Sequence, residues 1–383
     1  MEIDTWNTKL EWRGSELFDA SLLVLDAENT LVSCNARAQK LFLTNCSNKT
    51  ITFDDNCFWS LEKQGTFFLK EFKKYSGTTL SLLYRPEKAT PFLVTVAVDP
   101  FFLEGKEYLG LIFFRQAVES ENDEFSTDFM AYSFRQDLFA KNISVVYQPQ
   151  INVTNNTLYG VEALARWSSD EFGEVSPDVF VKIAESYSLI SELDLLVFNK
   201  ACLQFVHWRE NGISIPHISV NFSAMSFCDS NITNHIKTRL IELDIPFDHL
   251  IVEITERAPF PSNINIAGKI AELYFMGVKV SLDDFGTEYS NLKRLLKFPI
   301  SHLKLDRFFV HEFPHKMAVH LSRIIFNMSQ ELDVLAIAEG VETENQLSLL
   351  IDAGYRVVQG FLYSPPLSST EFEQWMKLRI TNS

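Results

Sequence analysis

The chain has 383 residues and a formal net charge of −16, and 46% of its residues are hydrophobic. This length suggests two or three domains, and the hydrophobic fraction argues against wholesale disorder. The acidic balance disfavours a protein that binds duplex nucleic acid through a basic surface.

The cysteines and the apolar runs indicate in which cellular compartment the protein is expected. The 5 cysteines are widely spaced and form no Cys-x-x-Cys pair, which argues against a zinc ribbon or a thioredoxin-like redox site. We expect free thiols in a reducing compartment. The N-terminus does not resemble a signal peptide, and no stretch reaches the ~18 apolar residues of a membrane helix. We therefore predict a cytoplasmic protein without a membrane segment.

The first part of the chain has the pattern of a small α+β domain. Apolar runs at residues 21–25 and 30–34 flank turn-forming residues 26–29, which predicts a β-hairpin. Asn35 is placed to cap a helix over residues 36–43. Three β-rich runs then predict a meander: residues 79–84, 91–98 and 108–114.

This order of elements resembles a PAS domain, which we place at residues 1–117 as a sensor domain. The region contains no histidine, which disfavours a haem held by a proximal histidine. Its ligand is unknown: a small apolar molecule and a ligand-free dimer platform both stay open. Residues 118–130 are strongly acidic, which predicts a solvated linker or, alternatively, a regulatory surface.

From residue 131 to the end, β-like runs alternate with helical patterns. The helical patterns include residues 130–140, 178–186, 192–210, 264–275 and 318–331. The β-like runs are residues 144–148, 158–163, 218–221, 251–255, 278–283, 302–304, 334–339 and 357–359. Eight strands with helical crossovers predict an α/β fold, a TIM-type (β/α)8 barrel over residues 131–383 whose parallel strands all end on one face.

Polar residues stand at or near the end of each predicted strand. Two adjacent carboxylates, Asp283 and Asp284, close the fifth run. The other runs carry Gln148, Glu162, Asn221, Glu253, Lys304, Glu339 and Gln359. Unpaired polar groups are costly to bury, and hard divalent cations take oxygen ligands from separate chain segments. The pattern therefore predicts a metal-dependent phosphodiester hydrolase.

Each polar residue alone also has a plain structural interpretation. The Asp283-Asp284 pair could be a turn or a helix cap, Glu162 could lie on a solvated strand face, and Asn221 could be a satisfied core amide. Lys304 is harder to explain in this way, because a lysine in an apolar strand requires a carboxylate or phosphate partner.

Residues 131–383 resemble an EAL domain, the cyclic di-GMP phosphodiesterase family. The tripeptide that names the family reads Glu162-Ala163-Leu164 here, and the other strand-end motifs follow in the family's order. The resemblance implies hydrolysis of cyclic di-GMP to linear 5′-pGpG with Mg²⁺ or Mn²⁺. With the N-terminal domain, it also implies a regulated enzyme that forms a homodimer.

The resemblance further implies a role for each motif residue. The implied ligands of a first metal are Glu162, Asn221, Glu253 and Asp283. Asp283 would bridge to a second metal, which Asp284 supports. Two such cations can stabilise the attacking and leaving oxygens of an in-line displacement and activate a water.

Catalytic and substrate-binding roles follow in the same way. Lys304 would hold the attacking water or the developing charge, and Glu339 would be the general base. Gln359 would orient the nucleophile, and Glu256 would brace the loop after the fifth strand. The implied substrate contacts are Gln148, Leu164, Arg166 and Asp284, among which Arg166 offers a planar fork suited to a phosphate.

The loop after the fifth strand departs from the family's pattern. Glu288 stands where the family usually has Gly, and Asn291 where it has Ser. If that glycine has a positive φ, another residue there costs on the order of 1 kcal/mol, and a carboxylate could disturb metal or phosphate binding. Glu288 could equally be a tolerated loop residue. Two alternatives to the enzyme stay open: a catalytically weak cyclic di-GMP receptor, and a barrel hydrolase acting on another phosphodiester.

Overall fold

The computed structural model describes residues 20–28, 31–35, 37–38, 58–60, 65–67, 69–84, 92–103, 105–115, 124–169, 172–255, 265–286, 295 and 298–381. The chain divides into two compact units, Met1–Gln136 and Asp137–Ser383. Within the described residues, no helix combines the length and the apolar character that a membrane span needs. Two of the cysteines in these ranges, Cys202 and Cys228, are free thiols.

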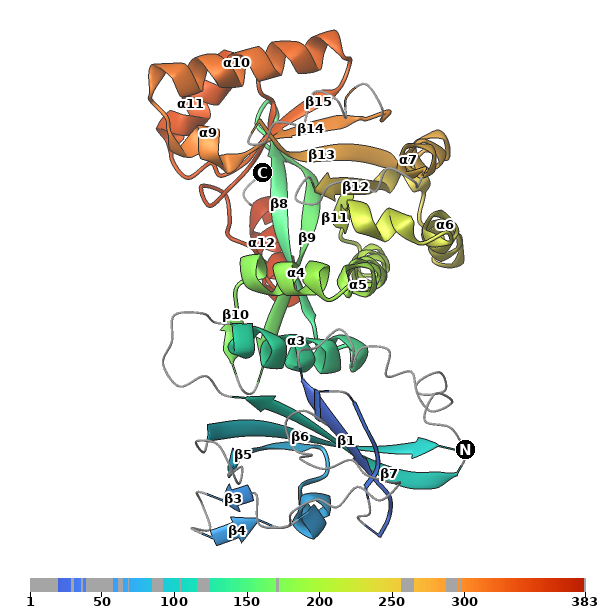
Figure 1. Ribbon diagram of the computed structural model, residues 1–383. Helices are drawn as coiled ribbons and strands as arrows, with labels where there is room; N and C mark the ends of the chain where they lie inside the picture. The colour runs from blue at the N-terminus through green and yellow to red at the C-terminus, as the bar shows by residue number, and fades with distance from the viewer. Residues whose placement is uncertain are drawn as a thin grey trace. The chain divides into compact units, whose positions relative to one another are not determined.

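The first unit is built on one antiparallel sheet with the strand order β2-β1-β7-β6-β5-β3-β4 (Figure 1). Its elements are β1 (Ser21–Leu25), β2 (Leu31–Cys34), β3 (Phe58–Ser60), β4 (Gly65–Phe67), the 3₁₀ helix η1 (Leu69–Tyr75), β5 (Thr78–Tyr84), β6 (Phe92–Leu103) and β7 (Lys106–Arg115). The predicted hairpin is confirmed as β1–β2, and the meander as β5-β6-β7. The sequence did not reveal β3 and β4, because strands of 3 residues are too short for a periodic signal.

Aromatic side chains fill the core of this sheet. Phe58 stacks on Phe113 with ring centroids 5.3 Å apart, and Phe72 meets Phe58 edge-on at 5.9 Å. Asn35 Oδ1 accepts from Ala38 N at 2.9 Å, as expected of a cap, but residues 36 and 39–43 of the predicted helix lie outside the described residues. The α+β character of this region is confirmed, and its assignment as a PAS domain stays a prediction.

The second unit contains the predicted (β/α)8 barrel. Its strands are β8 (Ser144–Asn152), β9 (Thr157–Ser169), β11 (Ile218–Ser223), β12 (Leu250–Thr255), β13 (Lys279–Phe285), β14 (His302–Leu305), β15 (Leu335–Ala338) and β16 (Val357–Gln359). They pair in the order β9-β11-β12-β13-β14-β15-β16-β8, and the β8–β9 pairing closes the barrel. A short strand, β10 (Gly173–Val175), extends β9 outside it.

Helices surround the barrel strands (Figure 1). They are α4 (Pro177–Ser186), α5 (Ile190–Glu210), η2 (Ala224–Cys228), α6 (Ile232–Glu242), η3 (Phe247–His249), α7 (Ile266–Phe275), α9 (Arg307–His311), α10 (Lys316–Glu331), α11 (Glu344–Ala353) and α12 (Ser369–Thr381). The predicted helices over residues 178–186, 192–210, 264–275 and 318–331 correspond closely to α4, α5, α7 and α10. The helix predicted over residues 130–140 begins earlier, as α3 (Glu124–Phe139), so the acidic stretch 118–130 includes its first turns.

One strand corrects the prediction of a wholly parallel barrel. β8 runs antiparallel to both neighbours, β9 and β16. Residues 153–156 form the turn that returns the chain from β8 to β9. This connection is too short for a parallel crossover, which needs a dozen residues or more. Gln148 therefore pairs with Glu162 in the middle of both strands instead of closing a parallel strand.

Candidate active site

An irregularity in β13 brings two neighbouring carboxylates to one side of the strand. Adjacent residues of a regular strand point to opposite faces. Here the register against β14 shifts between Leu282 and Phe285, and Asp284 has a φ of 51°. Aspartate tolerates this left-handed conformation better than most residues. Carboxylate oxygens of Asp283 and Asp284 consequently lie within 4.8 Å of each other and of Glu339.

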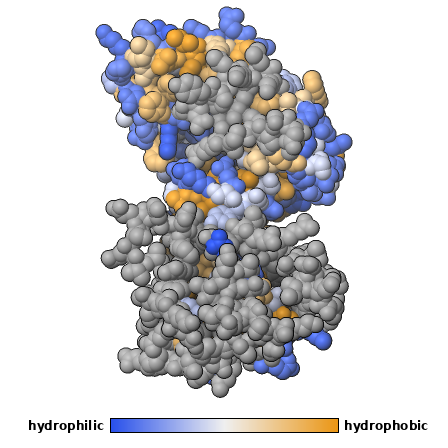
Figure 2. All heavy atoms as spheres, viewed as in Figure 1, coloured by the Kyte–Doolittle hydropathy of each residue, from blue (hydrophilic) through white to orange (hydrophobic). Residues whose placement is uncertain are grey.

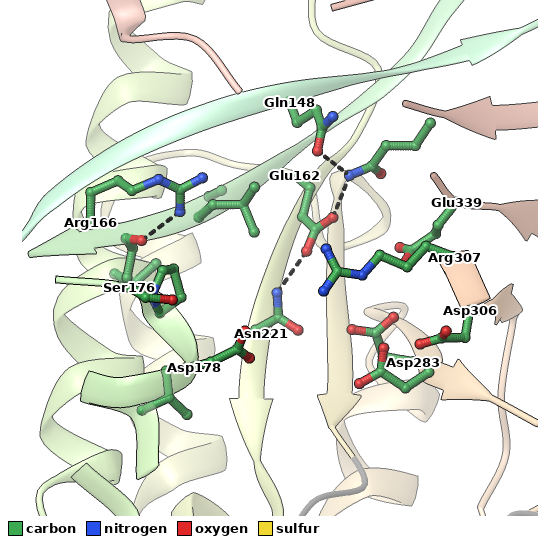
Figure 3. A pocket seen from close by; sticks show the side chains of 18 of the residues that line it. Gln148, Glu162, Arg166, Ser176, Asp178, Asn221, Asp283, Asp306, Arg307 and Glu339 are labelled. Carbon is green, nitrogen blue, oxygen red and sulfur yellow. Dashed lines mark hydrogen bonds between the residues drawn. The ribbon is translucent and has the colours of Figure 1, made fainter. Parts of the chain in front are cut away.

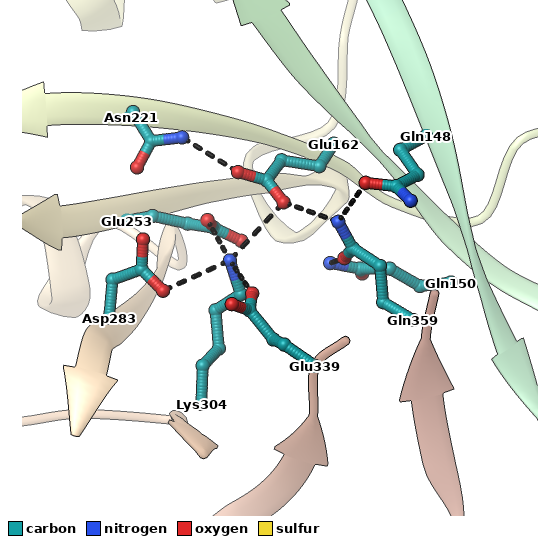
Figure 4. Close-up of polar contacts among 9 residues, drawn as sticks. All are labelled: Gln148, Gln150, Glu162, Asn221, Glu253, Asp283, Lys304, Glu339 and Gln359. Atoms are coloured by element: carbon teal, nitrogen blue, oxygen red, sulfur yellow. Dashed lines mark hydrogen bonds and ion pairs between the residues drawn. The ribbon is translucent and has the colours of Figure 1, made fainter. Parts of the chain in front are cut away.

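Lys304 lies at the centre of the buried carboxylates (Figure 4). Its Nζ is 2.5 Å from Glu339 Oε1, 2.6 Å from Glu253 Oε2, 3.2 Å from Asp283 Oδ1 and 3.3 Å from Glu162 Oε2. The side chain comes from β14 and is fully buried. This arrangement confirms the expectation that Lys304 needs a carboxylate partner, and it draws together side chains from four other strands or strand ends.

Two amide side chains donate to Glu162, and a third amide accepts from one of them (Figure 4). Asn221 Nδ2 donates to Glu162 Oε1 at 2.8 Å, and Gln359 Nε2 donates to Glu162 Oε2 at 2.7 Å. The same Gln359 nitrogen donates to Gln148 Oε1 at 3.0 Å. Lys304 Nζ also donates to Glu162 Oε2 at 3.3 Å. Donors from three strands, β11, β14 and β16, thereby fix the direction of this carboxylate.

Two loops after neighbouring strands pack tightly and hold Glu339 and Gln359 side by side. Val341 N donates to Gln359 O at 3.1 Å. A Cβ on Gly360 would lie 2.1 Å from Val341 O, so only glycine allows this approach of the two backbones. Gly340 adopts a φ of 70° in the same turn. The position of the two functional side chains therefore depends on these glycines.

Burial and the local charges shift the pKa values of the carboxyl groups in different directions. Burial alone would raise the pKa of Glu162, but the charge of Lys304 and the donated hydrogen bonds bring it below its ordinary value. Burial, together with neighbouring negative charges, holds the pKa values of Glu253 and Glu339 well above their ordinary range. The four carboxylates outweigh burial at Lys304 and keep its pKa well above normal. One lysine thus compensates only part of the negative charge, and a cation would find an electrostatically favourable site.

The donor set fits divalent cations. Carboxylate oxygens of Glu162, Glu253 and Asp283 lie within 4.8 Å of one another, and Asp283 also belongs to the group with Asp284 and Glu339. Two further oxygens in this region, Asn221 Oδ1 and Glu253 Oε1, are buried without a hydrogen-bond partner among the described residues. Hard cations such as Mg²⁺ and Mn²⁺ take ligands of this kind. Because Asp283 belongs to both groups, the two groups suit two neighbouring cations. Glu339 is a member of the second group, whereas the sequence analysis assigned it only the role of a general base.

A pocket of about 630 Å³ opens onto this cluster (Figure 3). The predicted substrate-contacting residues Gln148, Leu164, Arg166 and Asp284 all line it. Arg166 is half-buried, and its Nη1 donates to the backbone oxygen of Ala165 at 2.7 Å. Most of the predicted metal, catalytic and substrate residues that the structure describes line this pocket, whereas Glu253 and Lys304 are buried and do not line it. Three residues discussed from the sequence cannot be placed. Glu256, Glu288 and Asn291 lie outside the described residues.

Several pocket residues were not singled out from the sequence. Asp306 caps α9 by accepting from Phe308 N at 2.7 Å, and the exposed Arg307 follows it at the pocket. Both residues come just after the sixth predicted strand, so their position in the sequence could have identified them as candidate site residues. Asp194 is a buried carboxylate of α5 that also lines the pocket. Its burial and its role are visible only in the folded structure. In the sequence, a single aspartate within a helical pattern is expected to lie on the solvent-exposed face of the helix.

We expect the stability of the protein to depend on pH through Asp194. Burial raises the pKa of Asp194 from 3.8 to about 7, and Glu185 adds to the shift. Because the native state holds the proton more tightly than the unfolded chain, this group's contribution to stability falls as pH rises from about 4 to about 7. Relative to Asp194→Asn, the parent should lose about 1.4 kcal/mol of unfolding free energy per pH unit in this window. Urea unfolding of both proteins across the window measures the difference, and a pH-independent difference would contradict the assigned shift.

Residues 132–366 match the EAL domain family. The chain is 36% identical over 245 residues to the oxygen sensor protein DosP of Escherichia coli, covering 64% of this chain and 31% of DosP. It is 33% identical over 264 residues to the bifunctional diguanylate cyclase/cyclic di-GMP phosphodiesterase MucR of Pseudomonas aeruginosa, covering 68% of this chain and 38% of MucR. The cyclic di-GMP phosphodiesterase PdeR of Escherichia coli is 35% identical over 247 residues, 64% of this chain and 37% of PdeR. The chain therefore spans only about a third of the length of these relatives.

Solved structures share the barrel. The MucR phosphodiesterase in complex with c-di-GMP superposes with a TM-score of 0.59 and 33% identity, covering 64% of this chain and 99% of that chain. The EAL domain of FimX from Xanthomonas citri in complex with c-di-GMP has a TM-score of 0.57 and 26% identity. The match covers 64% of this chain and 96% of the FimX chain. The similarity thus extends over nearly the whole of each compared domain.

Proposed function

This chain belongs to the EAL domain family, and from that premise we propose that it is a phosphodiesterase that hydrolyses cyclic di-GMP to linear 5′-pGpG. In this reaction water forms a new bond to phosphorus, the bond from phosphorus to a ribose 3′ oxygen breaks, and the leaving oxygen takes up a proton. The observation that carries the proposal is the convergence of Glu162, Glu253, Asp283 and Glu339 on Lys304 beneath one pocket.

We propose that the chemistry requires Mg²⁺ or Mn²⁺. The cations would be held by Glu162, Asn221, Glu253 and Asp283 at one position and by Asp283, Asp284 and Glu339 at the other. When bound, such ions stabilise the attacking and leaving oxygens and lower the pKa of a water. The unpartnered Asn221 Oδ1 and Glu253 Oε1 support this assignment, because a buried oxygen acceptor without a partner is costly.

The side chains of the chain itself then have distinct tasks. Lys304 keeps mutually repelling carboxylates together, and Gln359 holds Glu162 in one direction. Glu339 is the candidate proton acceptor, because its carboxylate lines the pocket beside Asp283 and Asp284. Arg166 and Leu164, on the pocket wall, would bind a phosphate and a base of the dinucleotide.

We also propose that the N-terminal unit regulates the barrel. α3 supports this proposal because its C-terminal end is fastened to the strand that carries Glu162: Trp167 Nε1 donates to Asp137 Oδ2 at 2.8 Å. Trp167 directly follows Arg166 on β9. The same proposal includes three further assignments. They are the PAS domain, the cytoplasmic location and the domain boundaries 1–117, 118–130 and 131–383.

A homodimer is the proposed assembly. Large apolar side chains gather on the surface over α10 (Figure 2). Met317, Leu321 and Ile324 lie there with exposed fractions of 60%, 38% and 60%. The buried face of the helix carries Ala318, Ser322, Ile325 and Ser329. A second copy could cover this face, and sedimentation velocity of the full chain measures whether it forms a dimer.

The function is tested by turnover of cyclic di-GMP by the full chain with Mg²⁺, with Mn²⁺ and with EDTA. We expect linear 5′-pGpG in both metal conditions and none with the chelator. Binding of cyclic di-GMP without product would instead support the receptor alternative, and faster turnover of another cyclic dinucleotide would support a different substrate. The same assay on a chain lacking residues 1–117 tests regulation: an unchanged rate and metal dependence would exclude it.

A further inference from the structure

The orientation of Asn221 depends on how the end of β11 is held. Its Nδ2 donates to Glu162, and its Oδ1 is buried without a hydrogen-bond partner among the described residues. Asn221 pairs with Glu253 in the β11–β12 ladder, and β11 ends two residues later at Ser223. A shift of this strand end would therefore move the amide relative to both carboxylates.

We propose that Asp194 is a positioning residue that fixes the end of β11 and so directs Asn221 toward the carboxylate cluster, an inference that rests on the proposed metal-dependent function. Asp194 Oδ2 accepts from Ser223 N at 2.7 Å and from Ser226 Oγ at 2.6 Å. A single oxygen on α5 thereby holds both the last residue of the strand and the 3₁₀ helix η2 that follows it. Ser223 reinforces the link, because its Oγ accepts from Met225 N at 3.3 Å.

The surroundings of Asp194 separate this role from ordinary stabilisation. The side chain is 6% exposed, and in the part of the chain that the structure describes no cation pairs with its carboxylate. A buried carboxylate without a counter-charge costs stability unless it makes strong hydrogen bonds. Charge-assisted bonds of this length are the strong kind. Asp194 also lines the same pocket as Asn221 and Arg166, so its bonds fix a wall of that pocket.

The test is a Mn²⁺ titration of the full chain followed by thermal unfolding, which reports metal affinity without requiring turnover. Loss of a residue that orients a metal ligand typically costs 10–100-fold in affinity. We expect Asp194→Ala to raise the Mn²⁺ concentration at half-maximal stabilisation by about 10-fold. Asp194→Asn keeps an acceptor oxygen for both donors and should stay within about threefold of the parent. Ser226→Ala removes one of the two bonds and should give an intermediate shift.

Tyr355→Phe is the control for a simple loss of stability. It removes a buried hydrogen bond, from Tyr355 Oη to Ser322 O at 2.9 Å, on the side of the barrel covered by α10. It should lower the unfolding temperature and leave the Mn²⁺ midpoint unchanged. An unchanged midpoint in Asp194→Ala, or an equal shift in the control, would overturn the inference. If Asp194→Ala does not fold, an unchanged midpoint in Ser226→Ala overturns it instead.

Turnover of cyclic di-GMP by the same proteins separates the two proposals. Asp194→Ala should lower kcat with little change in KM, because the altered group holds a metal ligand and not the substrate. A parent that turns over the substrate, with a Mn²⁺ midpoint indifferent to residue 194, would refute the positioning role alone. A parent without turnover, whose Mn²⁺ midpoint still depends on residue 194, would refute the phosphodiesterase proposal and leave the positioning role standing.

Discussion

Replacing Lys304 with methionine should destabilise the metal-free protein by about 3–5 kcal/mol, because removal of one partner leaves buried charges uncompensated. Four carboxylates lie within 3.3 Å of Lys304 Nζ, and no other lysine or arginine in the described residues pairs with them. Methionine fills a similar volume, so lost packing contributes little. Turnover should fall by on the order of 10³-fold, the upper range for loss of one preorganised electrostatic contact.

Acidic conditions should reduce the stability loss in Lys304→Met. Without the lysine, Glu253, Glu339 and Asp283 will take up protons more readily, so their repulsion weakens as pH falls. Urea unfolding with EDTA at about pH 5.5 and about pH 8 measures the difference, which should be larger at the higher pH. Lys200→Met is the matched control, because within the described residues Lys200 Nζ donates to the backbone oxygens of Lys141 and Ile143 and pairs with no carboxylate. Equal losses at both pH values, or a loss in the control as large as that in Lys304→Met, would contradict this account.

Glu162→Gln should reduce turnover by more than the 10–100-fold that loss of a ligand's supporting partner costs. Three donors point at this carboxylate, from Asn221, Gln359 and Lys304. A glutamine offers one acceptor oxygen and turns an amide group toward one of these donors, so the network loses an acceptor and gains a clash of donors. The negative charge that would attract a cation is also lost.

The control for Glu162→Gln is the same substitution at Glu371. This exposed residue accepts from Ser368 at the start of α12 and is not among the residues that line the pocket. We expect turnover by Glu371→Gln to equal that of the parent. Turnover by Glu162→Gln at the parent's rate, measured at saturating Mn²⁺, would show that catalysis does not require the Glu162 carboxylate.

The sequence predicted the barrel well because its signals are local. Most strands contain a short apolar run, and the polar residue at or near its end stands out against it. Parallel strands deliver their ends to one face, so the proximity of Asn221, Glu253 and Asp283 followed from topology alone. The same argument did not predict strand direction, which depends on the connection. The shortness of the connection between β8 and β9, residues 153–156, was the feature of the sequence that indicated a hairpin.

Other features of the site could not be read from residue types. The register shift in β13 depends on how β13 and β14 pair, and it decides that Asp284 joins Asp283 on one side. The role of Asp194 rests on bonds to Ser223 and Ser226, about 30 residues away in the sequence. Such contacts are determined by packing of the finished barrel, so no local pattern records them.

The reversed direction of β8 also has a consequence for how proteins with this barrel can be assembled. Because Ser144, at the beginning of β8, pairs with Arg166 near the far end of β9, the chain enters the barrel on the same face as the pocket. An all-parallel barrel would receive its N-terminal extension on the opposite face, roughly a strand length of 3.3 Å per residue away. The first residue of β8 therefore stands at the same end of the barrel as Arg166 and the pocket. In a redesigned barrel of this type, the direction of the first strand alone decides at which end of the barrel the chain starts.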